Sequence, residues 1–170
     1  MNLLRSFVSG AALTVLLAAD VSYAADLNLA GLPLHAERGR ARALRERLPE
    51  ARSIVMLIDA RRTQTARWLD ELAESGFTGA GSVIIVVGET TSGERVGRQR
   101  LRLSAASWAS APLNTTLAHL DTSTLPAIYG IDAEGFVQWR LPVSGRRADE
   151  IALRIRDWLQ HEPRSAPESK

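Results

Sequence analysis

The sequence predicts an α/β domain with a central mixed sheet flanked by helices, made of a βαβ unit followed by a C-terminal ββα unit. Two continuous apolar runs, Ser53–Ala60 and Ser82–Glu89, lie on either side of a segment with helical periodicity. Such runs are typical of strands buried on both faces, and a helical connection makes them parallel neighbours. Thr124–Val143 then predicts a strand, an Asp-Ala-Glu-Gly turn and a second strand, and Gly145–Gln160 a closing helix.

The first 24 residues have the order of a secretory signal peptide. Arg5 precedes an apolar stretch from Phe7 to Ala19, and small residues follow up to Ala24 and Ala25, after either of which cleavage is expected. The stretch is shorter than the roughly 20 residues of a membrane-spanning helix. We expect export to the periplasm; an uncleaved anchor is the alternative. About 146 residues remain, enough for one domain.

The composition excludes whole classes of chemistry. The chain has no cysteine, so its core has no disulfide and no thiol-based mechanism is open to it. The net charge is +2, and almost every cation is arginine, since Lys170 is the only lysine. Arginine suits bidentate contacts to carboxylate or phosphate, although its use over lysine can also follow genomic composition.

Before the core domain, residues 25–52 form an N-terminal extension with a predicted strand and helix. Asp26–Leu34 alternates and predicts an edge strand or an extended lead-in. His35–Glu50 predicts a charged helix weakened by Gly39 and ended by Pro49. The domain itself is expected over residues 53–160, and the polar, proline-rich tail 161–170 is expected to be disordered.

Within the domain, the first helix is predicted from Thr63 to the Glu74-Ser75-Gly76 stop. Thr90–Ser104 predicts a glycine-containing loop that runs into an alternating strand, and Leu113–Asp121 is ambiguous. In the closing helix, four residues line one apolar face: Ile151, Ile155, Trp158 and Leu159.

Ser53–Gln160 resembles the thioredoxin-like superfamily, whose first core strand runs into a CxxC motif at a helix start. Here Thr-Gln-Thr-Ala occupies that place, with Thr63 at the position of the nucleophilic cysteine and Ala66 at that of its partner. "TLPAIYGIDAEGFV" resembles the family's cis-proline loop, which implies a cis bond between Leu125 and Pro126. The fold that this resemblance implies is thioredoxin-like.

The departures from that family exclude disulfide exchange. Leu57 stands where many redox members keep a buried acid, and Asp59, Arg61 and Arg62 replace the aromatic residues before the motif. Thiol chemistry needs a thiolate at the helix N-terminus, and there is none. "SIVMLIDARRTQTARWLDELAESG" and "LPAIYGID" are similar to the cysteine-free thioredoxin-like proteins of bacterial conjugative transfer systems, which are exported assembly factors.

Other motifs predict no nucleotide, nucleic-acid, metal or cofactor site. "GETTSGER" has Glu94 and Arg95 where a P-loop needs Lys and Ser or Thr. Arg98, Arg100 and Arg102 alternate without aromatic residues, which favours the solvent face of a half-buried strand. The three histidines, His35, His119 and His161, lack ligand spacing. Asp132 and Glu134 fit a hydrogen-bonded turn, and Trp139 and Trp158 fit the core.

We therefore expect a binding corner at the start of the first helix. Thr63 caps that helix, and the backbone of Leu125 can pair with an extended peptide as an added strand. The partner is an envelope protein or extended peptide, with membrane association only through a partner or an uncleaved signal. The predicted binding residues are Arg61, Arg62, Thr63, Gln64, Thr65, Ala66, Trp68, Leu125 and Pro126.

Two alternatives remain. One is a transferase or hydrolase that works through the hydroxyl of Thr63 or Thr65, for which Asp59 is the only candidate base. The other is a structural subunit of an envelope complex, which differs from a docking module mainly in the lifetime of its contacts.

Overall fold

A mixed five-stranded sheet in the order β5-β4-β3-β6-β7 forms the centre of the structure. The structure is a computed structural model, and it describes residues 27–37, 40–88, 95–114, 116, 120 and 125–160. β3, β4 and β5 run parallel, and β6 and β7 are antiparallel to their neighbours. The strands are β3 (Ser53–Ile58), β4 (Ser82–Val87), β5 (Ser107–Ala111), β6 (Ala127–Ile131) and β7 (Val137–Pro142).

The predicted βαβ unit is confirmed. Every residue of β3 and β4 is buried, which explains why both strands are continuous apolar runs rather than alternating ones. Helix α1 (Thr63–Glu74) connects them and buries Trp68, Leu69 and Leu72. It ends at the predicted stop, where Gly76 adopts the left-handed φ of 86° that glycine tolerates best.

The predicted hairpin of β6 and β7 is also confirmed, and Asp132 is the turn acid expected from the sequence. Its carboxylate accepts hydrogen bonds from the backbone N–H of Glu134 and Phe136 and from the amide of Gln138. Gly135 has a φ of 91°, and a Cβ there would also collide with Ala30. These bonds fix the turn. They assign the carboxylate of Asp132 to the turn rather than to a paired-carboxylate site with Glu134.

Helix α4 (Ala148–Gln160) closes the domain through the apolar face that its periodicity predicts. Ile151 and Ile155 are buried, and Trp158 is partly buried at the rim of the sheet. The indole of Trp158 donates to the carbonyl of Ser53 and meets the buried Trp139 edge to face, with ring centroids 5.9 Å apart.

The predicted helix over His35–Glu50 is wrong. That segment starts inside the antiparallel pair β1 (Pro33–Glu37) and β2 (Arg40–Ala43) and continues into the short 3₁₀ helix η1 (Leu44–Arg47). Only Leu44 and Leu48 are large apolar residues between positions 35 and 50, so an α-helix would have had almost no apolar face to bury.

The segment before β1 is an extended lead-in. Its backbone bonds to the start of β7, from the N–H of Leu29 to the carbonyl of Gly135 and from the N–H of Val137 to the carbonyl of Leu27. Four leucines of the extension then enter the core: Leu29, Leu32, Leu34 and Leu44.

The strand predicted to follow the glycine-containing loop is also wrong. Residues 97–102 form helix α2 (Gly97–Arg102), which buries Gln99, and the next strand is β5, which the sequence did not predict. Arg98 and Arg102 lie one helical turn apart and both pair with Asp70 of α1, at 2.5 and 3.0 Å. The alternation of arginines therefore reflects a helix bound to α1 rather than a strand facing solvent.

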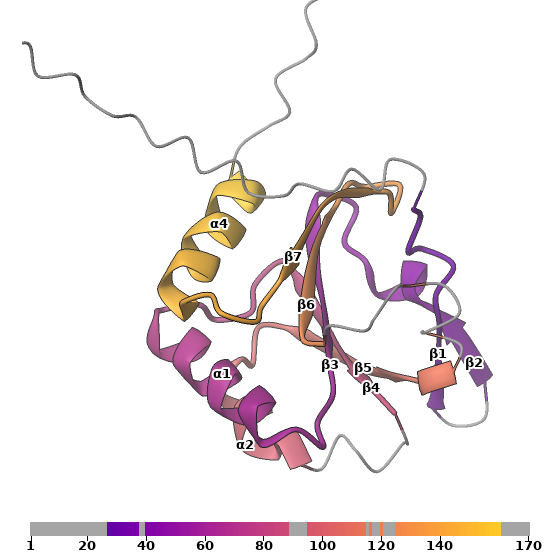
Figure 1. The fold of residues 1–170 in the computed structure, drawn as a ribbon. Coiled ribbons are helices and arrows are strands. Elements are labelled where there is room, and N and C mark those ends of the chain that lie inside the picture. The colour runs from indigo at the N-terminus through magenta and orange to yellow at the C-terminus, as the bar shows by residue number, and fades with distance from the viewer. Residues whose placement is uncertain are drawn as a thin grey trace, which may run out of the picture.

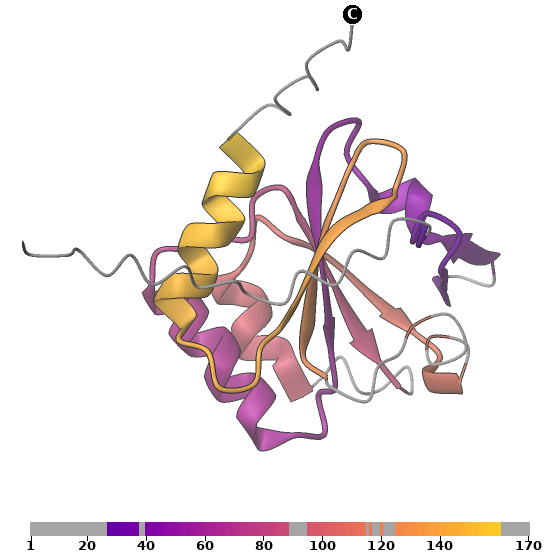
Figure 2. The same cartoon turned by 45° about the horizontal axis from the view of Figure 1, so that its top comes forward.

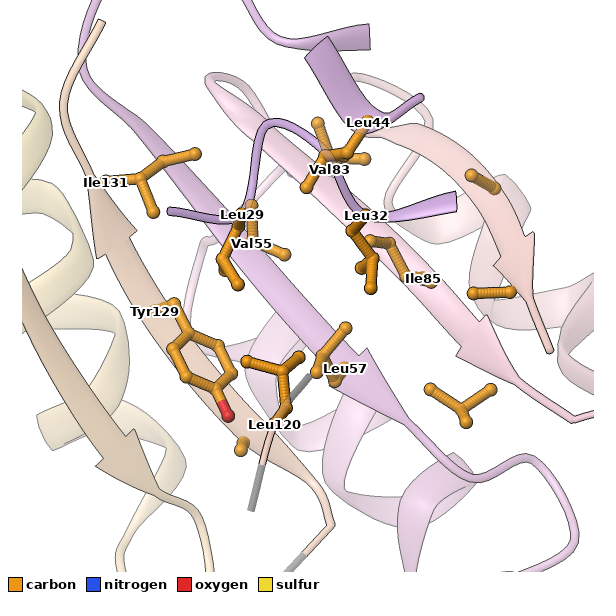
Figure 3. Close-up of a cluster of buried hydrophobic side chains, with 14 of the residues drawn as sticks. Leu29, Leu32, Leu44, Val55, Leu57, Val83, Ile85, Leu120, Tyr129 and Ile131 are labelled. Atoms are coloured by element: carbon orange, nitrogen blue, oxygen red, sulfur yellow. The ribbon is translucent and has the colours of Figure 1, made fainter. Parts of the chain in front are cut away.

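The two faces of the sheet carry different layers. Figures 1 and 2 show α1, α2 and α4 on one side and the β1-β2 hairpin with η1 on the other. Figure 3 shows the buried apolar cluster on the side of the hairpin, in which Leu29, Leu32 and Leu44 of the extension lie over Val55, Val83 and Ile85 of the sheet. The N-terminal extension thus shares one apolar cluster with the sheet.

Several predictions fall outside the described residues. They are the signal peptide at 1–24, the tail at 161–170, most of the loop Gly88–Arg95 and most of Leu113–Asp121. Within the described residues, no helix has the length and apolar character that crossing a membrane requires.

We predict that Leu44→Ala destabilises the whole domain. The side chain of Leu44 is fully buried, so truncation should lower the free energy of unfolding by about 2–5 kcal/mol. Leu101→Ala is the matched control, since Leu101 is 80% exposed and its loss should change stability by about 0.5 kcal/mol or less. Urea denaturation measures both variants; equal midpoints would show that the extension does not stabilise the sheet.

We also predict that Gly130→Ala is strongly destabilising. The indole of Trp139 packs against Gly130 from the neighbouring strand, and an added Cβ would overlap its Cε2 and Nε1 atoms. Overpacking of this kind costs about 1–3 kcal/mol or more. The control is Gly97→Ala, since nothing lies within 4 Å of a Cβ there. A thermal melt in which both variants match the parent protein would contradict this packing.

Candidate functional site

The corner after β3 is organised by the carboxylate of Asp59, which is 6% exposed. Its Oδ1 accepts the backbone N–H and Nε–H of Arg61, both at 3.0 Å, and its Oδ2 accepts Nη2–H of Arg61 at 3.0 Å. Arg62 Nε lies 3.7 Å from Oδ2, and the N–H of Arg62 donates to the Asp59 carbonyl. These contacts close the turn that leads the chain into α1.

Asp59 is held in its charged form. The side-chain hydrogen bond from Arg61 lowers the pKa of this carboxyl below its ordinary value, against the raising effect of burial, and the charges of Arg61 and Arg62 lower it further. A carboxylate with a lowered pKa and occupied oxygens is a poor proton acceptor. Asp59 therefore shapes the corner rather than serving as a base.

The peptide bond between Leu125 and Pro126 is cis, as the resemblance implies. Nη1 of Arg62 donates a 2.8 Å hydrogen bond to the carbonyl of Leu125. This bond places the proline loop directly beside the start of α1. The two sequence regions expected to meet at the corner therefore do meet.

A groove of about 590 Å³ opens between α1, the proline loop and the turn after β7. From α1 its walls include Arg62, Gln64 and Trp68, and the loop contributes Leu125 and Pro126. These five residues are the part of the predicted binding set that the structure brings together in one cavity.

The other four predicted residues do not line the groove. The side chain of Arg61 is hydrogen-bonded to Asp59, and Thr63 is exposed at the first position of α1. Thr65 is fully buried, and Ala66 is partly buried. The predicted capping role of Thr63 is wrong: Arg62 holds the N-cap position and makes no side-chain cap bond, because the Asp59 turn brings the chain into the helix one residue earlier.

Sequence reasoning missed the third wall and part of the first. Val143–Arg146 form the turn after β7, in which Gly145 has a φ of 76° and the N–H of Val143 donates to the Pro126 carbonyl at 3.2 Å. Arg67 and Glu71 of α1 also line the groove and form an i,i+4 ion pair at 2.8 Å. The i,i+4 spacing and the Ser-Gly-Arg-Arg turn were visible in the sequence, but their place beside Pro126 was not.

The hydroxyl groups of this corner have no catalytic setting among the described residues. Oγ1 of Thr65 is buried and makes no hydrogen bond, so a substrate cannot reach it. Thr63 is exposed, and the candidate base that the sequence offers, Asp59, is engaged by Arg61. Within the described part of the chain, no three His, Asp or Glu side chains are grouped to hold a metal ion.

Together, the fold and the corner define a class. A central mixed sheet with α1 following its middle strand, and a cis-proline loop at the start of that helix, is a thioredoxin-like fold. The corner that carries cysteines in the redox members of this class here carries an arginine-lined groove, and the chain has no cysteine.

Comparison with solved structures gives the same fold. A secreted Mycobacterium tuberculosis disulfide oxidoreductase homologous to E. coli DsbE is 10% identical, with a TM-score of 0.51 over 74% of this chain and 95% of that one. MTB DsbF, in mixed oxidised and reduced forms, is 9% identical, with a TM-score of 0.56 over 76% of this chain and 96% of that one. The exposed lipoprotein thioredoxin of Streptococcus pneumoniae is 13% identical, with a TM-score of 0.52 over 74% of this chain and 98% of that one. No protein-family model and no curated protein matches the sequence.

We predict that the corner loses its ionic stabilisation in acid. Because the folded-state pKa of Asp59 is lowered, its contribution is complete above the unfolded pKa of about 3.9 and is lost as the pH falls through the folded value. Asp59→Asn should therefore cost about 1–2 kcal/mol at neutral pH, discounted because its guanidinium partners are half exposed.

The difference in urea midpoint between Asp59→Asn and the parent protein should shrink steadily as the pH falls below about 4. Glu71→Gln is the control, because Glu71 forms an exposed i,i+4 pair and should change the midpoint little at any pH. A constant Asp59→Asn difference at all pH values would mean that the charge of Asp59 does not support the corner.

Proposed function

We propose that the chain is an exported, redox-inactive thioredoxin-like protein that acts as a binding or assembly module in the bacterial envelope. The observation that carries this proposal is the groove between α1, the cis-proline loop and the turn after β7. It lies at the corner where the redox members of the fold do their chemistry, and it offers Arg62, Trp68 and Pro126 in place of thiols.

The proposed location rests on two supports. Residues 1–24 have the order of a secretory signal peptide. Two of the compared proteins are described as secreted and as an exposed lipoprotein. We propose the periplasm as the compartment of this chain, and a conjugative transfer system as its setting, the latter on the short sequence similarity alone.

The proposed partner is an envelope protein that presents an extended segment to the groove. A groove with mixed polar and apolar walls favours docking over catalysis, since Asp59, the candidate base for the hydroxyl of Thr63, is engaged by Arg61. A stable structural subunit would use the same surface with a longer-lived contact, and a salt wash of purified envelope complexes distinguishes the two.

We predict that groove positions cross-link to a specific partner in cells. A photoreactive phenylalanine analogue replaces Gln64 or Ser144, two exposed residues of the groove wall, and Leu101 on α2 serves as the remote control. Both groove positions should yield the same discrete adduct, because one docked segment contacts both walls. The Leu101 position should not yield it.

The adduct must also depend on the shape of the groove. With the probe at Ser144, Gln64→Trp places a bulky ring in the groove wall and should strongly reduce the adduct, whereas Leu101→Trp should preserve it. An adduct that Gln64→Trp does not reduce, or that forms equally with the probe at position 101, would place the interface elsewhere.

A further inference from the structure

We infer that the groove selects partner segments that carry carboxylates, which Arg62 and Arg146 bind, rather than segments that add a strand at Leu125. This inference rests on the proposed docking function and names the chemistry of the segment. It depends on three features: the occupied carbonyl of Leu125, the charge of the walls and their apolar floor.

The carbonyl of Leu125 is already occupied. An added strand needs free backbone acceptors on the receiving segment. Here Nη1 of Arg62 donates to that carbonyl at 2.8 Å, and its Nε lies 3.7 Å from the carboxylate of Asp59. An incoming backbone N–H would have to share this oxygen with the charge-assisted bond from Arg62 or displace it, so strand addition is the disfavoured mode.

The same tether leaves Arg62 ready for an anion. A guanidinium has five N–H donors, and the contacts to Leu125 and Asp59 involve only Nη1 and Nε. The side chain of Arg62 is 51% exposed, so its remaining donors reach the groove without a full desolvation cost. Arg62 is thus a positioned site for bidentate binding of a carboxylate.

Arg146 provides the second cation, from the opposite wall. It is exposed, and among the described residues no carboxylate pairs with its side chain. Arg67 also lines the groove, but its Nε is engaged by Glu71, the only carboxylate among the described residues of the lining. These described residues therefore carry three cations against one anion, a charge pattern complementary to an acidic segment.

The groove also has apolar residues in its lining. Trp68, Pro126 and Val143 lie in the wall, and Trp68 is 94% buried by its surroundings. A partner side chain between two acidic residues can rest on this surface, as anchor residues do at interfaces. The predicted ligand is an extended peptide with acidic residues that flank an apolar one.

Selection from a phage-displayed library of random dodecapeptides at low ionic strength tests the inference on the intact protein. Binders of the parent protein should be enriched in Asp and Glu around an apolar residue. For a synthetic peptide of the enriched sequence, Arg62→Gln combined with Arg146→Gln should weaken affinity roughly tenfold, and so should replacement of the peptide's acids by their amides.

A matched control removes the same net charge elsewhere. Arg45→Gln combined with Arg156→Gln changes two exposed arginines outside the groove and should leave affinity unchanged. If this control weakens binding equally, the effect is one of net charge and the inference fails. It also fails if a single-stranded oligonucleotide displaces the peptide as well as the acidic peptide itself does, because the groove would then prefer polyanions in general.

The remaining outcomes separate this inference from the proposed function. Neutral peptides that are enriched, and that Gln64→Trp excludes, would leave docking intact and overturn the acid preference. Enriched peptides that Gln64→Trp does not exclude, or no enrichment over a blank surface, would overturn both.

Discussion

The buried carboxylate of Asp59 is the constraint on which the corner of this protein depends. It sits at the end of β3, where the chain leaves the sheet, and it is contacted by donors of Arg61 and Arg62. Because a buried charge is tolerated only when it is paired, Asp59 determines where Arg61 and Arg62 must lie. Arg62 in turn reaches Leu125, so one carboxylate fixes both the start of α1 and its distance from the cis-proline loop.

The same corner explains what the fold retains after the loss of its cysteines. In redox members of the class, the positive end of the first helix stabilises a thiolate. Thr63 cannot ionise in that place, so the first residue of α1 carries no charge for the field of the helix to stabilise. Arg62 adds positive charge to the same region. The corner therefore carries positive charge beside the start of α1, of which the carboxylate of Asp59 balances a part.

The sequence predicted those parts of the fold that local patterns determine. β3, β4 and α1 follow from continuous apolar runs and helical spacing, and Pro126 from its place before an apolar strand and a D-x-x-G turn. The β1-β2 hairpin and α2 were mispredicted because their partners lie far along the chain. Leu44 belongs to the same buried cluster as Val83, and Arg102 pairs with Asp70, and neither relation leaves a periodic trace in the local sequence.

The residues of the groove also fall into two groups, those that a sequence motif predicts and those that only a tertiary contact brings there. Arg62, Trp68 and Leu125 were predicted because a motif places them, whereas Arg146 belongs to the groove only through the contact of Val143 with Pro126. The three compared structures share the fold at 9–13% identity, which apolar patterning alone permits. Since the sheet tolerates such change, the fold leaves the corner residues free to differ. The chemistry of this corner therefore follows from Asp59, Arg62 and the groove beside them rather than from the sheet beneath them.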